Sequence, residues 1–167
     1  MQEADSIADH GRGKTSYRSI VGQLLYLATW TRPDVAFGIS KAAQTITAAT
    51  VAYLQHLNKL VQDTKARRHV AVVLRRGTVD LKSCTMVAHG DSAFANMEGE
   101  KSQCGVTISA IMEKDVEEYH NGRCDRGWPM SWTSSTIKRV VRSTLAAEAY
   151  AVSEAGEDAE YIRSVLA

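Results

Sequence analysis

The chain has 167 residues, of which 44% are apolar and 23% charged, and its net charge is +1. This composition is typical of one ordinary globular domain or two very small ones, and it excludes collagen-like, low-complexity and fully disordered chains. The sequence has no apolar run of the roughly 18 to 20 residues that span a membrane, and no signal-peptide pattern at its start. We therefore expect no membrane partner.

The charge is divided unevenly along the chain. Residues 1–82 carry 12 Lys and Arg against 6 Asp and Glu, whereas residues 83–167 carry 8 against 13. A basic half followed by an acidic half favours two modules, one facing phosphate and one collecting carboxylates, although chance also produces such a division.

The first half of the chain predicts a lead-in followed by three helices. Residues 1–16 are polar and contain glycine, which is typical of a flexible lead-in. Apolar residues at helical spacing then predict helices over 17–28, 34–46 and 51–61. Pro33 and Asp34 favour the start of the second helix, where Asp34 complements the exposed amides, and Thr50 can cap the third.

The pattern then changes from helix to strand. β-branched residues at 70–74 predict a strand, and the runs at 84–89 and 105–109 predict a hairpin with its turn at 99–101. A polar stretch over 113–127 separates this hairpin from a short third strand at 129–132. Ser143 and Thr144 then open an alanine-rich helix with apolar positions up to Leu166.

Most familiar catalytic signatures are missing from the sequence, which has no phosphate-binding glycine loop, HExxH, GxSxG, paired CxxC or Asp-Asp. Its three cysteines, Cys84, Cys104 and Cys124, stand twenty residues apart, which predicts reduced thiols rather than disulfides or a zinc site. Two separated carboxylates remain, Asp91 after a strand and Glu148 early in the last helix. They could hold a divalent metal, although any chain with 19 acidic residues offers many such pairs.

Three groups of motifs resemble the Pol polyproteins of copia-type LTR retrotransposons. Residues 17–27 and 31–37, YRSIVGQLLYL and TRPDVAF, resemble the YRSLVGxLLYL and TRPDIAY segments that follow the polymerase active site. The run from Asp91 to Gly105 resembles the opening of the ribonuclease H domain of that family. Residues 131–135 and 143–155, SWTSS and STLAAEAYAVSEA, resemble its ISWSSKKQ and SSTEAEYIALSEA segments. The matches stand in the order and spacing of the family.

The resemblance implies the fold class and the domains. We expect an α+β chain in which residues 17–82 form a helical segment from the end of the reverse transcriptase. Residues 83–167 would form a ribonuclease H-like α/β domain that is incomplete at its C-terminus, with an antiparallel three-strand meander and a covering helix.

The resemblance also implies the activity, which is hydrolysis of the RNA strand of an RNA/DNA hybrid during reverse transcription. Asp91 and Glu148 match the first two carboxylates, which would be catalytic and bind metal, with two Mg²⁺ ions as cofactors. The family places a further Asp on a strand after this helix, so we expect negligible hydrolysis by residues 1–167 alone. A catalytically inactive, truncated remnant with at most weak nucleic-acid binding is the alternative, and nothing in the sequence tests a domesticated interaction module.

Other residues support a metal site poorly. Asp158 lies about 15 Å along the helix from Glu148, too far to share one metal cluster. Glu154 and Glu160 are interpreted as solvated charges, and His89 as a structural histidine. The sequence also departs from the family, because Ala93 and Phe94 stand where Asp-Trp is usual.

Four basic residues are candidates for nucleic-acid contact, although solvated loop charges explain them equally well: Lys101, Lys138, Arg139 and Arg142. The expected partners are an RNA/DNA hybrid and the remainder of the Pol polyprotein. We also expect an unpaired sheet edge that favours self-association. The expected location is a cytoplasmic virus-like particle or the nucleus.

Overall fold

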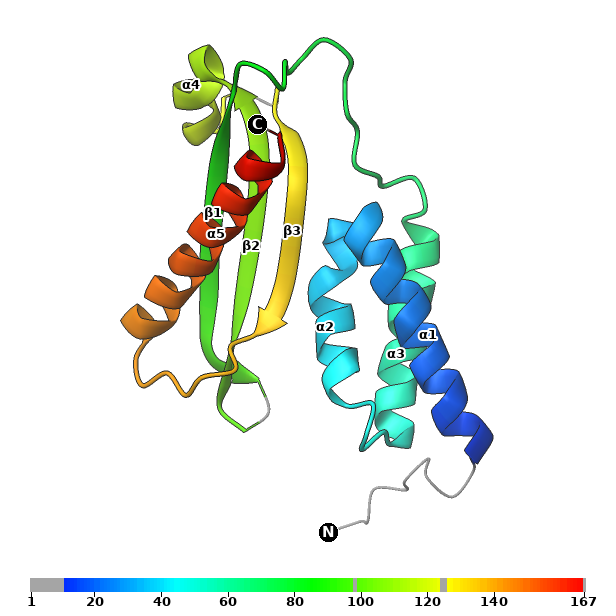
Figure 1. The fold of residues 1–167 in the computed structure, drawn as a ribbon. Coiled ribbons are helices and arrows are strands. Elements are labelled where there is room, and N and C mark those ends of the chain that lie inside the picture. Colours follow the sequence, from blue (N-terminus) through cyan, green and yellow to red (C-terminus); the bar gives the residue numbers. More distant parts are fainter. Residues whose placement is uncertain (1–10, 98, 124–125, 167) are drawn as a thin grey trace. The chain divides into compact units, whose positions relative to one another are not determined.

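The computed structural model describes residues 11–97, 99–123 and 126–166. The chain divides into two compact units, one up to Val72 and one from Val73 (Figure 1). The predicted boundary, after Lys82, therefore lies within the second unit. In the described ranges, no helix combines the length and the apolar character needed to cross a bilayer.

The first unit is helical. It contains α1 (Gly11–Trp30), a short 3-10 turn η2 (Pro33–Val35), α2 (Ala36–Gln44) and α3 (Val51–Ala66), which confirms the three predicted helices. α1 begins six residues earlier than the predicted start, inside the predicted lead-in. The cap on α3 is also confirmed, because the Thr50 side chain accepts a hydrogen bond from the Tyr53 backbone at 3.3 Å. The helices, the turn η2 and the connection from α2 to α3 together supply the core, which consists of Tyr17, Val21, Leu24, Ala28, Val35, Ile39, Ala49 and Leu57.

An ion pair between a buried guanidinium and a more exposed carboxylate holds the turn between α1 and α2. The Arg32 guanidinium, only 5% exposed, donates to both carboxylate oxygens of Asp34 at 2.7 and 2.8 Å, and a third N–H reaches the Thr64 carbonyl of α3 at 3.4 Å. The prediction that Asp34 complements the helix amides is therefore incomplete, because its carboxylate is bound to Arg32. These hydrogen bonds lower the pKa of Asp34, although partial burial opposes them.

We expect this ion pair to make the helical unit acid-sensitive. The pKa of Asp34 is lower in the folded chain than the unfolded value of about 3.9, so its stabilisation is present above that value and is lost as pH falls through the folded pKa. Asp34→Asn leaves the buried Arg32 guanidinium without its charged partner and should destabilise the unit by about 1 to 3 kcal/mol at pH 7. Amide hydrogen exchange of α1–α3 from pH 3 to 7 measures this, with Asp63→Asn on the exposed face of α3 as control. Equal losses in both variants would contradict it.

The strand predicted over 70–74 is wrong. These residues form no strand, and the side chains of Val73 and Leu74 are 66% and 56% exposed. Among the described residues, one backbone hydrogen bond joins this stretch to a distant part of the chain, from the Val72 N–H to the Thr31 carbonyl at 3.4 Å. β-branched residues favour an extended backbone, but a strand forms only beside a partner strand.

The second unit is a three-stranded sheet covered by a long helix. β1 (Cys84–Met97), β2 (Lys101–Met112) and β3 (Trp128–Thr136) pair antiparallel in the order β1-β2-β3. α5 (Thr144–Leu166) lies over β1 and β2 (Figure 1). The predicted α+β class, the antiparallel meander and the covering helix are confirmed. The stretch predicted as polar and irregular contains a 3-10 turn η3 (Glu113–Asp115) and α4 (Val116–His120).

Close contact between α5 and the sheet depends on small residues. Three alanines of α5, Ala147, Ala151 and Ala155, are buried against Cys104, Val106 and Ile108 of β2. On β1, the closest approach is at Gly90, where an added Cβ would lie 2.2 Å from the Ala151 carbonyl oxygen. Backbone therefore meets backbone at this point, and no side chain fits between them.

We expect Gly90→Ala to disrupt the second unit. The new methyl group would force α5 away from β1, and overpacking of this kind costs about 1 to 3 kcal/mol or more. Gly105→Ala is the matched control, because Gly105 lies on the neighbouring strand, adjacent in register, and its added Cβ meets nothing within 4 Å. Urea unfolding followed by circular dichroism compares the two. Similar midpoints for both variants would contradict the tight contact.

Candidate functional site

Asp91 lies in the regular part of β1, opposite Gly105 of β2. Its neighbour Gly90 faces α5, and successive residues of a strand point to opposite faces of the sheet. The side chain of Asp91 therefore leaves the sheet on the face that α5 does not cover, where it is exposed.

Glu148 lies in the first turns of α5 and is half-buried. Helix and strand run in opposite directions, because Gly90 meets Ala151 whereas Thr85 and Met86 share a groove with Ala159 and later residues of α5. From the Gly90–Ala151 contact, Glu148 is about 4.5 Å along the helix and Asp91 about 3.3 Å along the strand, in the same direction. Asp91 and Glu148 therefore lie at about the same height along the β1–α5 pair, which we call the carboxylate level. They lie on opposite sides of β1, because α5 covers one face and Asp91 leaves the other.

Burial, and after it the negative charge around the carboxylate level, raises the pKa of one thiol, that of Cys104. Cys104 of β2 pairs with Ser92 and belongs to the core under α5. Burial raises the pKa of the Cys104 thiol, and the charges of four carboxylates raise it further, in the order Glu154, Asp158, Asp91 and Glu148. The candidate carboxylates therefore lie within electrostatic reach of the same buried atom.

The other acidic residues of α5 differ in their surroundings. Glu154 is half-buried on α5, and a hydrogen bond between it and Tyr150 raises the pKa of that tyrosine. Partial burial, followed by the charges of Glu154 and Glu157, raises the pKa of Asp158. Glu160 is exposed, as predicted.

The oxygen donors at this level suit a hard cation. Mg²⁺ is often held by only one or two carboxylates, completed by water and substrate phosphates. Beside Asp91, the Ser92 hydroxyl oxygen is buried and has no hydrogen-bond partner within the described part of the chain. Those described residues contain no group of three or more His, Cys, Asp or Glu side chains that could hold a metal. The carboxylates of Asp91 and Glu148 are therefore oxygen ligands of the kind that Mg²⁺ prefers.

His89 has a packing partner of its own. On the Asp91 face of the sheet, its ring lies 5.9 Å from that of Tyr119 and 5.8 Å from that of His120, both on α4. The Tyr119 hydroxyl also donates to Ser109 of β2 at 3.3 Å. These contacts agree with the structural role predicted for His89.

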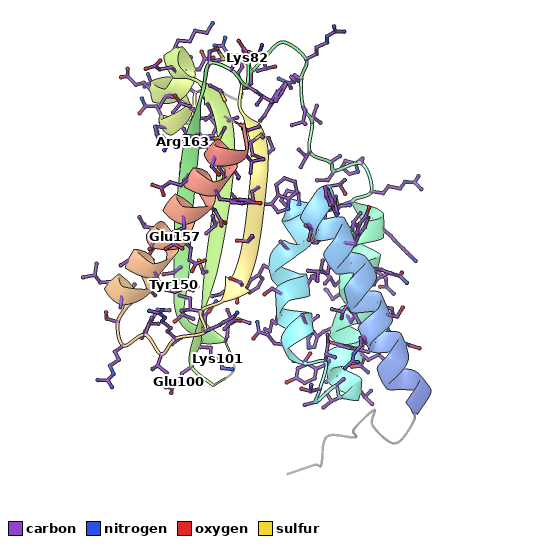
Figure 2. The ribbon with its side chains drawn as sticks, in the orientation of Figure 1. Lys82, Glu100, Lys101, Tyr150, Glu157 and Arg163 are labelled. Carbon is purple, nitrogen blue, oxygen red and sulfur yellow. The ribbon has the colours of Figure 1, made fainter. Side chains whose placement is uncertain are left out.

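Three of the four predicted basic residues line one pocket. Lys101 at the start of β2, and Lys138 and Arg139 in the connection from β3 to α5, surround a cavity of about 710 Å³. Figure 2 shows Lys101 at the hairpin end of the sheet. Arg142 is exposed and is not among the lining residues. No salt bridge found in the described ranges involves these three cations.

Sequence reasoning missed the aromatic residue of this pocket. Phe94 contributes an exposed aromatic ring to it. The sequence did contain a signal for Phe94, because an aromatic residue stands here, three residues after Asp91, where the family usually has Trp. Its proximity to the basic residues depends on strand pairing, which the motif does not specify.

We expect Cys104 to resist thiol reagents while Cys84 reacts. Both are free thiols, as predicted for the cysteines, but Cys84 is partly exposed whereas Cys104 is buried with a raised pKa; Cys124 lies outside the described residues. In a Cys124→Ser background at pH 8, Cys84 should label at least about tenfold faster, because the thiolate is the reactive form. Mass spectrometry of the labelled peptides measures this. Equal rates in the folded protein would contradict it, whereas equal rates in urea are the control.

Comparison with known proteins gives two curated relatives, each aligned over 152 residues, or 91% of this chain. They are the "Retrovirus-related Pol polyprotein from transposon RE1" and the "Retrovirus-related Pol polyprotein from transposon RE2", both of Arabidopsis thaliana, with 30% and 26% identity. The chain is therefore similar to a segment of retrovirus-related Pol polyproteins. It spans about 9% of the length of these relatives. No family model and no solved structure matches it.

Proposed function

We propose that the chain is a segment of a copia-type retrotransposon Pol polyprotein in which the second unit is ribonuclease H-like. The first unit is then the end of the reverse transcriptase. Two relatives that are Pol polyproteins support this proposal, as does the order of the three motif groups along the chain. In this proposal the second unit contributes to hydrolysis of the RNA strand of an RNA/DNA hybrid during reverse transcription.

The observation that carries this proposal is the common level of Asp91 and Glu148 on the β1–α5 pair. The Gly90–Ala151 contact fixes the height of the helix against the strand, so the carboxylate on each element is held by rigid backbone. Asp91 and Glu148 would hold Mg²⁺, which when bound activates a water molecule and stabilises the leaving oxygen. Asp91 is exposed and therefore accessible to a nucleic-acid backbone.

The basic pocket would position the hybrid. Lys101, Lys138 and Arg139 lie at the hairpin end of the sheet, toward which β1 continues from Asp91. Contacts of Lys and Arg to phosphate fix the register of a nucleic acid without reading its sequence, and contacts to the 2′-hydroxyl distinguish the RNA strand. Arg142, in the same connection, would add to the positive field.

The alternative function is weak nucleic-acid binding by a catalytically inactive remnant. Two observations favour it. Asp91 and Glu148 lie on opposite sides of β1, and the described residues contain no third metal ligand beside them. The basic pocket serves this alternative equally well.

The remaining partners follow from the same proposal. The rest of the Pol polyprotein would contact this segment in a cytoplasmic virus-like particle or in the nucleus. β1 and β3 are both edge strands in the described sheet, each with one side unpaired. Open edges of this kind also favour self-association.

Metal binding tests the proposed site without requiring turnover. Mn²⁺, used as a paramagnetic substitute for Mg²⁺, should broaden the amide signals around Asp91 and Glu148 when an RNA/DNA hybrid is present. Asp91→Asn and Glu148→Gln should each weaken Mn²⁺ binding by at least about tenfold, a loss typical even of outer-sphere partners. Glu160→Gln, an exposed carboxylate on the same helix, should not.

Cleavage of a labelled hybrid in Mg²⁺ and in EDTA completes this test. Any cleavage by the chain should disappear in EDTA and in both carboxylate variants. Robust cleavage that survives Asp91→Asn would contradict the assigned site. Wild-type protein that binds the hybrid but no Mn²⁺ would establish the inactive alternative.

A further inference from the structure

One buried serine joins the two walls of the basic pocket. The first wall is the β1–β2 hairpin and the second is the connection from β3 to α5. The Ser102 hydroxyl, in a residue only 2% exposed, accepts a hydrogen bond from the Ala95 N–H at 3.1 Å. Its carbonyl accepts one from the Ile137 N–H at 2.8 Å. The separation of the walls is therefore fixed by the fold.

A bulge in β1 brings Phe94 into this pocket. Pairing with β2 is regular up to Ala93 opposite Gln103 and resumes at Met97 opposite Lys101, so residues 94–96 lie outside the ladder. Ala95 adopts a φ of 49°, which L-residues other than Asn and Asp rarely do. Bulges re-aim side chains, and here the Phe94 ring is 39% exposed on the pocket wall instead of packing in the core.

The pocket combines an apolar floor with a basic rim. Ile137 is 3% exposed and belongs to the core under α5, so it forms a rigid base, and Val141 packs beside it. Lys101, Lys138 and Arg139 line the same cavity together with one acidic residue, Glu100, so the rim carries a net positive charge. A ligand that matches this surface has a flat apolar part and a nearby negative charge. Its size is limited by the volume of about 710 Å³, which lies in the range of pockets for small ligands.

We propose that this pocket binds one unpaired nucleotide, with its base stacked on Phe94 and its phosphate beside Lys101, Lys138 and Arg139. Aromatic rings in basic grooves bind single-stranded nucleic acid in this way, because every base offers a π-face. A base within a duplex is covered on both faces by its neighbours and is not accessible to Phe94. The ligand is therefore a single-stranded tail or gap that adjoins a hybrid.

This inference deepens the proposed function and rests on it for the nature of the ligand. Phe94 follows Asp91 by three residues on the same strand. A tail held on Phe94 would place the junction between paired and unpaired nucleotides near the candidate carboxylates. The pocket would thus favour hybrids with a single-stranded extension over blunt hybrids.

Binding in EDTA tests this without metal or turnover. Fluorescence anisotropy compares a blunt RNA/DNA hybrid with the same hybrid carrying a single-stranded tail of four thymidines. The tail should tighten binding to the wild-type chain by at least about fivefold, the lower limit for one stacked base. Phe94→Leu keeps an apolar side chain without the π-face and should abolish this gain. Phe94→Trp should retain it, with quenching of the fluorescence of the new Trp.

A charge variant tests the phosphate contacts separately. Lys101→Gln should reduce the salt dependence of tail binding by about 0.7 in the slope of log K against log salt, the value for one contact to a single strand. Lys82→Gln is the matched control, because Lys82 lies at the other end of the sheet unit (Figure 2). Circular dichroism confirms that the variants remain folded.

Two results would overturn the inference. One is a tail that tightens binding to Phe94→Leu as much as to the wild type. The other is an equal fall in salt slope for Lys82→Gln and Lys101→Gln, which would indicate diffuse attraction. A tail effect without Mn²⁺ binding at Asp91 and Glu148 would instead reject only the proposed catalysis. Metal binding without a tail effect would reject only the nucleotide pocket.

Discussion

The second unit depends on the backbone contact between Gly90 of β1 and Ala151 of α5. A side chain at position 90 would collide with the helix carbonyl, and the buried alanines of α5 allow the same close approach to β2. This contact fixes the height of the helix on the strand. It thereby sets the level of Glu148 against Asp91 and buries Cys104 among carboxylates, which raises the pKa of that thiol. The geometry of the candidate site is thus a consequence of packing in the core.

Much of the fold could be predicted from the sequence because periodic patterns were long. The three helices before Val72, the hairpin and the alanine-rich helix follow from spacing and caps, whereas the antiparallel three-strand meander was implied by the family resemblance. The failure at 70–74 has a physical cause, since β-branched residues specify an extended backbone but not a partner strand. Asp34 shows a second limit, because its position suits both a helix start and an ion pair with the nearby Arg32. Only the folded chain brings the Thr64 carbonyl to Arg32, which holds that guanidinium in place.

The site was predicted less completely than the fold. The motifs name Asp91 and Glu148 as the carboxylates, but they do not specify which face of the strand each one leaves. That depends on the register of β1 with β2 and on the contact at Gly90. The pocket at the hairpin end was harder still, because the interruption of the ladder after Ala93 exposes Phe94, and Ser102 bonds to residues seven positions before it and thirty-five after it. Long-range pairing of this kind leaves no local signal in the sequence.

The opposite faces of Asp91 and Glu148 restrict where a shared ion would lie. β2 closes one side of β1 by pairing along it, so the two faces of β1 meet only at its unpaired side. Asp91 and Glu148 would therefore hold a shared ion only by reaching around this open edge of β1. The same edge carries unpaired backbone groups that favour pairing with another chain. Strand pairing along this edge would thus take place beside the two carboxylates.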